Sequence, residues 1–388
     1  MKRLLLAGAG HAHLHVLKAL AAGRPRGVET ILVTPHLRQM YSGMLPGWIA
    51  GHYALDECAV RLEPLARAAG VRLLQDSVAG LHAERRTVRC AEAGELGYDV
   101  LSIDTGARLD ASSLAATGAA LLPIRPLEAF VVAWERQVER FARAGRAALA
   151  VVGGGAAGVE LALAIRHRLA RLIGEDRTSV TLVAGGGLLA GHGATVVERA
   201  ERALRAAGVG IVKCHAAGAP TGLQLADGRE WAVDCVVAAT GASPPGWLAD
   251  SGLALDGRGF IAVGDGQRSL SHAEVFAAGD VATRQDAPHA KSGVYAVRAG
   301  PVLSVNLARA LEGRPIVSYR PQRRSLYLLA TGPKAAIVSW RGLTAAGKWA
   351  WRWKDRIDRR FLMQYDVAEK ENHELAEGDR PAVRAGRH

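Results

Sequence analysis

The sequence is poor in the residues that mark disulfide-bonded, zinc-binding or membrane-spanning proteins. Only four of its 388 residues are cysteines, and they show neither CxxC nor CxxxxC spacing. This argues against a structural zinc site, a disulfide framework and a redox-active dithiol. Because no run of about 18 apolar residues occurs, we expect no membrane-spanning helix. The composition indicates a protein of the reducing cytoplasm, either soluble or attached to a surface.

Positive charge is abundant, but no nucleic-acid motif accompanies it. The net charge is +12, and the arginines are spread along the chain rather than clustered. We therefore expect no nucleic-acid partner; an anionic membrane surface or a diphosphate cofactor accounts better for the charge. Of His11, His13 and His15, only His11 and His15 share a helical face, and they have no third metal ligand nearby in sequence, so we predict no metal site. A phosphate contact at His11 and a plain helix face both stay open.

Two stretches of the chain share one plan of strand, glycine turn, helix and strand. The first has these parts at 4–6, 8–13, 15–22 and 30–33; the second has them at 148–152, 153–158, 159–173 and 179–183. Each half closes with an apolar strand that runs into Thr-Gly, at Thr105-Gly106 and Thr240-Gly241. This repetition predicts an internal duplication of one nucleotide-binding unit.

The predicted fold class is α/β, with two Rossmann-like dinucleotide-binding domains. Alternating strands and helices favour parallel sheets that are covered on both faces. The first domain is discontinuous and the second is inserted into it, followed by a C-terminal interface segment. We set the limits at 1–112 and 251–320 for the first domain, 113–250 for the second, 321–365 for the C-terminal segment, and 366–388 for a disordered tail.

The first glycine turn departs from the dinucleotide fingerprint at two positions. Gly8-Ala9-Gly10 follows an apolar strand and opens a helix, where backbone N–H groups can approach a pyrophosphate. His13 stands at the third glycine position, which should weaken strand-to-helix packing. Thr34 ends the second strand, where an acid usually binds the ribose hydroxyls. A glycine turn that binds nothing is the alternative.

The second glycine turn is a full match. The run from Gly153 to Gly158 satisfies GxGxxG between a strand and a helix. The following strand ends at Ala184, so neither a carboxylate for NADH nor an arginine for the phosphate of NADPH is visible. NADH is favoured because no cation is placed for that phosphate.

Two acidic residues are further candidates. Glu160 lies near the start of the second helix, where either the helix dipole stabilises it or the nucleotide rings lie beside it. Gly279-Asp280 follows an apolar strand at 274–278. The carboxylate of Asp280 can accept hydrogen bonds from sugar-alcohol hydroxyls, although a surface turn can also read Gly-Asp.

This pattern resembles the flavoproteins with two dinucleotide domains, which include type II NADH dehydrogenases, sulfide:quinone oxidoreductases and flavocytochrome c sulfide dehydrogenases. The resemblance covers about residues 1–365. It implies FAD contacts at Gly8, Gly10, Thr105, Gly106, Gly279 and Asp280, with His11 and Thr34 as further candidates. It implies NAD(P)H contacts at Gly153, Gly155, Gly158 and Glu160, with Thr240 and Gly241 closing the second domain. Pro288 to Gly293 resembles a region that faces the flavin pyrimidine, so Lys291 is a catalytic candidate; a plain surface lysine is the alternative.

The chain also resembles the flavoprotein module that is fused to selenide, water dikinase in some bacteria. Gly10 to His13, Tyr41 to Gly47 and Lys354 to Phe361 carry this resemblance. The function implied is an FAD-dependent NAD(P)H oxidoreductase that passes hydride from nicotinamide C4 to flavin N5, and electrons to a quinone or another acceptor. The alternative is a redox partner module for selenide, water dikinase with little turnover. Sulfide:quinone oxidoreduction is weaker, because the cysteines are scattered.

The segment from Gly342 to Tyr365 combines tryptophans with basic residues. Four apolar residues have helical spacing: Trp349, Trp353, Ile357 and Phe361. We expect this face to dock on the FAD domain or to lie in a membrane interface. Contact with lipid would place the protein on the inner face of the membrane and favour a quinone as acceptor.

Overall fold

Two five-stranded parallel sheets form the framework of the structure, a computed structural model that describes residues 1–322 and 325–367. The predicted α/β class and the two Rossmann-like units are confirmed. We expected 366–388 to be a disordered tail, and residues 368–388 of this segment lie outside the described residues.

Four of the five strands in each sheet have the same order, as a duplication requires, but the fifth, an edge strand, is the last of its sheet in sequence in the first unit and the first in the second unit. The first runs β21 (Val275–Ala277), β9 (Val100–Ile103), β1 (Lys2–Ala7), β2 (Val28–Thr34), β5 (Arg72–Gln75). The second runs β11 (Ala120–Pro123), β18 (Cys235–Ala238), β12 (Ala147–Val152), β13 (Thr178–Val183), β14 (Val209–Val212). All four residues of β9 and of β18 are buried, because helices or loops cover both faces of a parallel sheet.

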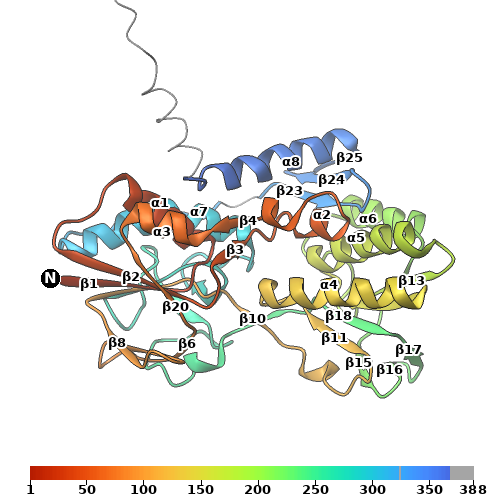
Figure 1. Ribbon diagram of the computed structural model, residues 1–388, viewed down its shortest axis with the longest axis horizontal. Helices are drawn as coiled ribbons and strands as arrows, with labels where there is room; N and C mark the ends of the chain where they lie inside the picture. Colours follow the sequence, from red (N-terminus) through yellow and green to blue (C-terminus); the bar gives the residue numbers. More distant parts are fainter. Residues whose placement is uncertain (323–324, 368–388) are drawn as a thin grey trace, which may run out of the picture.

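The chain leaves the first sheet after β9 and returns to it at β21. The segment that forms the second sheet is therefore inserted into the sequence of the first unit. The two crossing segments pair as antiparallel strands, β10 (Arg108–Leu109) and β19 (Ala242–Ser243). Figure 1 shows the two units side by side, with the first at the left and the second at the right. The proposed limits at 112/113 and 250/251 fall near this crossing.

Long helices cover the sheets: α1 (His11–Ala22), α3 (Leu62–Ala69) and α7 (Gly293–Leu311) in the first unit, and α4 (Leu127–Ala144), α5 (Ala156–Ile173) and α6 (Ala194–Ala206) in the second. α1 and α5 begin earlier than predicted. Gly10 and Gly155 are their N-caps, so each helix starts directly after the second glycine. The sequence interpretation had placed the whole glycine motif in the turn.

Short elements decorate this framework. Three small antiparallel sheets comprise β6 (Val78–His82), β7 (Thr87–Cys90), β8 (Glu95–Gly97); β15 (Ala216–Ala219), β16 (Gly222–Leu225), β17 (Glu230–Ala232); and β3 (Arg38–Met40), β4 (Ala59–Arg61). A parallel pair is formed by β20 (Ile261–Val263) and β22 (Ala282–Arg284). The short helices are α2 (Leu45–Ile49), η1 (Leu55–Cys58), η2 (Ser112–Leu114), η3 (Gly246–Leu248) and η4 (Gly279–Val281).

A C-terminal layer lies across both units. It consists of the antiparallel strands β23 (Tyr327–Ala330), β24 (Ala336–Trp340) and β25 (Leu343–Gly347), followed by α8 (Lys348–Met363). α8 is at the top of Figure 1. Trp351 belongs to the core cluster of the second unit and Phe361 to a cluster of the first. The helix therefore joins the two units.

The face of α8 that docks differs from the face expected from the sequence. Trp349, Trp353 and Ile357 are 50%, 39% and 40% exposed, and of the expected face only Phe361 is buried. The buried side of the helix instead carries Trp351 with the charged residues Lys354 and Asp358. Helical spacing alone could not identify this side, because it includes an ion pair.

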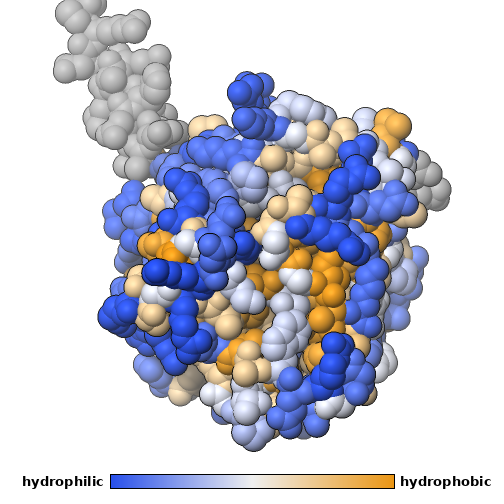
Figure 2. All heavy atoms as spheres, turned by 90° about the vertical axis from the view of Figure 1, so that its right-hand side faces the viewer, coloured by the Kyte–Doolittle hydropathy of each residue, from blue (hydrophilic) through white to orange (hydrophobic). Residues whose placement is uncertain are grey.

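At the end of the molecule formed by the second unit, hydrophilic residues surround an area of hydrophobic residues near the middle of the face (Figure 2). Among the described residues, no helix is long and apolar enough to cross a bilayer.

Candidate functional site

The first glycine turn leaves no room for side chains. A Cβ atom on Gly8 would lie 2.6 Å from the carbonyl oxygen of Asp104, and one on Gly10 would lie 2.4 Å from its carboxyl. Gly8 also has φ of 87°, in the left-handed region that favours glycine. The turn is therefore held tightly between β1 and the end of β9, with the N-terminus of α1 directly behind it.

His13 takes a buried polar role where the fingerprint has glycine. Its ring lies between the Gly8 carbonyl oxygen, 2.6 Å from Nδ1, and the Ser102 hydroxyl oxygen, 2.7 Å from Nε2. Burial lowers the pKa of His13 to about 4, so the ring is neutral near pH 7. We expected His13 to weaken the packing between the first strand and its helix. The imidazole instead bridges the glycine turn to β9.

Eleven buried side-chain polar atoms have no hydrogen-bond partner among the described residues, and three of them belong to elements around this turn. They are Nε2 of His11, Oγ1 of Thr105 and Oγ of Ser292. Buried polar groups are nearly always paired, so three such atoms around one turn are consistent with a ligand that binds there. They come from the start of α1, the end of β9 and the N-cap of α7, which are the places where a dinucleotide would be held. The residues present therefore fit FAD.

Two predicted FAD residues have less direct placements. Thr34 is buried at the end of β2, and its hydroxyl is 3.5 Å from the carbonyl oxygen of His36. Gly106 has φ of 72°, and a Cβ atom there would meet nothing within 4 Å. Neither observation assigns a cofactor contact.

Asp280 is paired across the two units. Arg125, which follows β11 of the second unit, places Nη2 2.7 Å from Oδ2 of Asp280. The preceding Gly279 has φ of 71°, and a Cβ atom there would lie 2.5 Å from Oδ1 of Asp104. The sequence analysis missed Arg125, because only the crossing of the chain brings it to Asp280.

The second glycine turn has the packing that its motif predicts. A Cβ atom on Gly158 would lie 1.8 Å from the carbonyl oxygen of Gly153, and one on Gly153 would lie 2.1 Å from that of Ala239. Gly155 differs, since a Cβ atom there would meet nothing within 4 Å. The N-terminus of α5 therefore opens onto free space that a diphosphate could fill. Farther along, the Thr240 hydroxyl donates to the carbonyl oxygen of Asp110, 2.7 Å away, and Gly241 is exposed at the crossing between the units.

Glu160 lies one turn deeper in α5 than the sequence analysis assumed. It is the fifth residue of the helix, and the first turn contains no acid, so the helix-dipole interpretation is not supported. Its Oε1 accepts the Ala330 N–H at 2.8 Å, which ties α5 to the C-terminal layer. Burial raises the pKa of Glu160 to about 7, although Lys354 opposes the shift.

Lys291 is partly buried and already has partners. Its ammonium donates to the Ala282 carbonyl oxygen at 2.5 Å and to the Thr283 hydroxyl at 2.8 Å. It also lies 3.8 Å from the centre of the Phe260 ring. Burial lowers the pKa of Lys291 to about 8. The description of a plain surface lysine does not fit this environment.

The sequence matches the model of one protein family, the pyridine nucleotide-disulphide oxidoreductases, over residues 2–300. This range includes both glycine turns and Gly279-Asp280. The chain belongs to this family. It is accordingly an FAD-dependent oxidoreductase that uses NAD(P)H.

Solved structures share this fold at low sequence identity. The sulfide:quinone oxidoreductase of Aquifex aeolicus superposes with a TM-score of 0.77 at 16% identity, covering 97% of this chain and 95% of that chain. NDH2 of Plasmodium falciparum, in complex with NADH, gives 0.76 at 12% identity, covering 94% and 97%. A ferredoxin reductase of Rhodopseudomonas palustris gives 0.71 at 20% identity, covering 87% and 82%.

In this oxidoreductase a buried polar cluster joins α8 to the loop after β3. Lys354 donates to the Gly43 carbonyl oxygen and lies 2.6 Å from the Asp358 carboxylate. Tyr41 stacks on Phe361 with ring centroids 4.4 Å apart. From the sequence, Tyr41, Gly43, Lys354 and Asp358 were recognisable only as parts of motifs, and Phe361 also as part of the apolar face of the helix. No spacing rule predicts that the loop and the helix meet.

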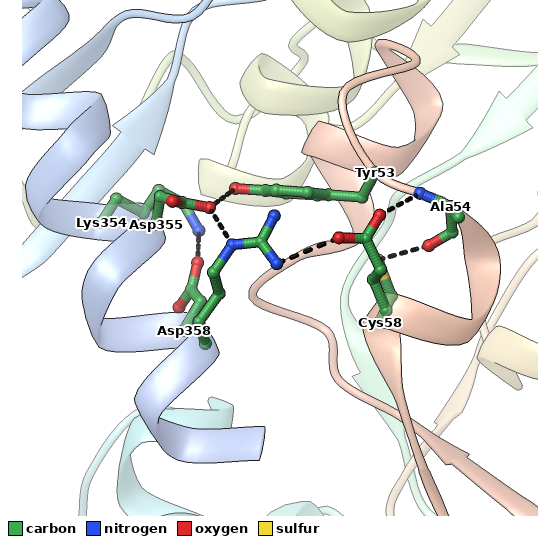
Figure 3. Close-up of polar contacts among 8 residues, drawn as sticks. Tyr53, Ala54, Cys58, Lys354, Asp355 and Asp358 are labelled. Carbon is green, nitrogen blue, oxygen red and sulfur yellow. Dashed lines mark hydrogen bonds and ion pairs between the residues drawn. The ribbon is translucent and has the colours of Figure 1, made fainter. Parts of the chain in front are cut away.

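A second set of contacts ties α8 to the segment around η1 (Figure 3). The Tyr53 hydroxyl donates to Asp355 at 2.7 Å, and Arg359 bridges Asp355 and Glu57 at 3.0 Å each. Cys58, in the same segment, is fully buried, and its thiol donates to the Ala54 carbonyl oxygen. The polar contacts fix the helix over the first unit.

Proposed function

We propose that this oxidoreductase takes electrons from NADH into FAD and delivers them to a quinone. The presence of two glycine turns supports this most directly. Around the first turn, buried polar atoms of His11, Thr105 and Ser292 lack hydrogen-bond partners among the described residues. The second turn opens onto free space at Gly155. When bound, FAD accepts a hydride from the nicotinamide and passes the electrons to the acceptor.

The roles of the protein's own residues follow from their positions. We assign FAD binding to Gly8, Gly10, His11, Thr105, Gly279 and Asp280, with Thr34 and Gly106 added on the family resemblance alone. We assign nicotinamide-nucleotide binding to Gly153, Gly155, Gly158, Thr240 and Gly241. Glu160 holds a proton near neutral pH that it can give to the acceptor. Lys291 supplies positive charge next to the N-terminus of α7, where negative charge on a reduced cofactor is favourable.

The nucleotide preference is for NADH. The loop after β13 begins with Ala184 and Gly185, and a Cβ atom on Gly185 would lie 2.5 Å from Nδ1 of His215. The cation that follows β14, Lys213, is engaged 2.5 Å from Glu201. A 2′-phosphate would therefore gain no free lysine or arginine from these loops.

The exposed side of α8 supports peripheral attachment to an anionic membrane. Trp349 and Trp353 stack at 6.4 Å, and Ile357 continues their line along the helix. The β24–β25 hairpin adds Trp340 and Leu343, which are 42% and 70% exposed. Tryptophan and basic residues together favour a membrane interface, so we place the protein on the cytoplasmic face of the membrane.

Vesicle co-sedimentation tests this attachment. The double variant Trp349→Ser/Trp353→Ser should lose most of its binding to vesicles that contain anionic lipid. Leu172→Ser is a matched control, because Leu172 is 44% exposed and belongs to α5 rather than to α8 or the β24–β25 hairpin. Equal binding of the double variant and the wild type would contradict the proposal.

Steady-state oxidation of NADH with a soluble quinone tests the function itself. We expect turnover with quinone, and a higher kcat/KM for NADH than for NADPH. A protein that is reduced by NADH but not reoxidised by any quinone would exclude the proposed acceptor and retain the flavin chemistry.

Three of the four cysteines do not favour sulfide oxidation. Cys58, Cys90 and Cys235 are buried, and burial raises their pKa values to about 12, 11 and 12. Thiolates are the nucleophiles in sulfur chemistry, and these thiols stay protonated at neutral pH.

A role as partner of selenide, water dikinase is the second candidate. The three motifs behind that resemblance converge in the structure: the His11 ring lies 5.6 Å from that of Tyr41 and 5.9 Å from that of Phe361. Purified selenide, water dikinase should then bind the protein, and NADH consumption should be slow. Rapid consumption without binding would exclude this role.

A further inference from the structure

Asp104 marks a difference between the two halves of the duplication. The first half ends in Asp104-Thr105-Gly106, and the second has Ala239 in the place of the aspartate. In both halves the carbonyl oxygen of this residue lies behind the first glycine of the turn, Gly8 or Gly153. Only the first half, however, adds a carboxyl group at this point.

The Asp104 carboxyl occupies the N-terminus of α1. Its Oδ2 accepts the N–H groups of Ala12 at 2.8 Å and of His13 at 3.0 Å. These first-turn donors have no partner within the helix and normally favour an anion. Asp104 is only 2% exposed, so its charge is poorly screened by solvent.

The same carboxyl lies next to Gly10 and Gly279, two of the glycines assigned to FAD. Cβ atoms on Gly10 and on Gly279 would lie 2.4 Å and 2.5 Å from its Oδ1. A diphosphate held by the first turn would therefore lie close to this carboxyl. Two negative groups at one buried helix terminus repel each other strongly.

We propose that Asp104 couples FAD binding to proton uptake: the cofactor binds to the form in which this carboxyl is neutral, and an ionised Asp104 takes up one proton from solvent as FAD binds. The neutral acid keeps accepting the N–H groups of α1 through one oxygen. Its O–H becomes a donor for a phosphate oxygen. No electron transfer accompanies this step.

The surrounding charged groups set the direction of the pH dependence. Burial and the nearby Asp280 raise the pKa of Asp104 to about 7, against the two backbone hydrogen bonds. His11 and His13, on α1, have pKa values lowered to about 4 by burial and stay neutral. Arg125 is paired with Asp280. FAD affinity should therefore be constant below about pH 7 and fall by up to about tenfold per pH unit above it.

Lys291 also titrates in this range. Its pKa is lowered to about 8 by burial, and it feels the charge of Asp280. Loss of its positive charge would weaken FAD binding at high pH as well. Asp104→Asn separates the two effects, because Lys291 is unchanged in that variant.

The experiment equilibrates the holoenzyme with free FAD by ultrafiltration at a series of values between about pH 6 and pH 9. In the wild type the Kd should rise steeply above about pH 7. In Asp104→Asn, whose amide can accept and donate hydrogen bonds, the rise should be much smaller and FAD should stay bound at the highest pH. Asp234→Asn is the matched control, since Asp234 accepts the Ala148 N–H at 3.0 Å in the second unit.

A second measurement keeps the test independent of folding defects. Calorimetry of FAD binding in two buffers of different ionisation enthalpy should show uptake approaching one proton by the wild type at about pH 8, and almost none by Asp104→Asn. Asp104→Ala, which restores the residue of the second half, serves if the asparagine variant does not fold. The same pH slope in the wild type and the variant would overturn the proposal.

The inference rests on the assignment of FAD to the first unit. Its failure can nevertheless be distinguished from failure of that assignment. FAD binding without pH dependence removes only the role of Asp104, whereas no FAD binding at any pH removes the assignment itself.

Discussion

Glu160 is the residue whose titration should control turnover. Burial raises its pKa to about 7, so the neutral acid is present below that pH and is lost as the pH rises through it. We expect kcat with quinone to fall as the pH increases above about 7. Glu160→Gln should lower kcat by about 10²-fold and abolish this pH dependence, with the FAD content unchanged.

Stopped-flow measurement of the two half-reactions checks this role. Reduction of the flavin by NADH should change little in Glu160→Gln, while reoxidation by quinone should become slow. An unaltered pH profile in the variant would show that Glu160 only ties α5 to Ala330.

His13 should matter for stability. His13→Ala removes the contacts with Gly8 and Ser102 and leaves a cavity, which should cost about 2–4 kcal/mol of unfolding free energy. Burial lowers its pKa from 6.5 to about 4, so in the wild type this stability is lost as the pH falls from 6.5 towards 4. Urea denaturation at several pH values measures both effects.

Ser102→Ala is the control for that experiment. It removes one partner of His13 without a large cavity, and should cost about 1–2 kcal/mol. The bridging role would be contradicted if His13→Ala lost less unfolding free energy than Ser102→Ala. It would also be contradicted if the pH dependence of the unfolding free energy were the same in His13→Ala as in the wild type.

For single residues, the sequence was informative where a short motif carries the information. The glycines of the two turns and Gly279-Asp280 could be identified from their spacing and the preceding strands. Arg125 could not, because the crossing between the units brings it to Asp280. The difference between Asp104 and Ala239 was visible in the sequence, but its meaning required the hydrogen bonds to α1.

At the scale of elements, α8 is the least expected part of the structure. Its periodicity predicted a helix, and α8 spans Lys348–Met363. Of the two alternatives for the tryptophan face, docking was wrong for Trp349, Trp353 and Ile357, which are exposed. Here a charged pair is buried instead, with Lys354 and Asp358 side chains 9% and 7% exposed.

That pair gives a prediction for α8. Lys354→Met leaves the buried Asp358 carboxylate without its cationic partner, with only the Tyr41 hydrogen bond remaining, and should destabilise the protein by about 3–5 kcal/mol. The double variant Lys354→Met/Asp358→Leu should recover a large part of this loss, because no unpaired charge is left. Thermal and urea denaturation of the three proteins measure the coupling.

Limited proteolysis shows whether the effect is confined to α8. We expect Lys354→Met to be cut near α8 sooner than the wild type, with the double variant between them. A double variant no more stable than the single one would mean that the hydrogen bond to Gly43, rather than the charge of Asp358, is the main contribution of Lys354.

At the scale of the molecule, the duplication explains why the fold could be predicted. Two glycine turns and two Thr-Gly ends are strong signals, and the order that four strands of each sheet share follows from them. The layer of β23–β25 and α8 could not be placed in this way. Its position depends on contacts such as Glu160 with Ala330, which join residues far apart in sequence.

The central claim is that two nucleotides meet between these units, and anaerobic reduction tests it directly. The purified protein should be yellow, and NADH should bleach its flavin band within seconds. Gly155→Leu should keep FAD but lose the bleaching, because its side chain would fill the free space before α5 without meeting protein atoms near the backbone. A colourless protein that takes up no flavin, or equal bleaching in Gly155→Leu, would contradict the account.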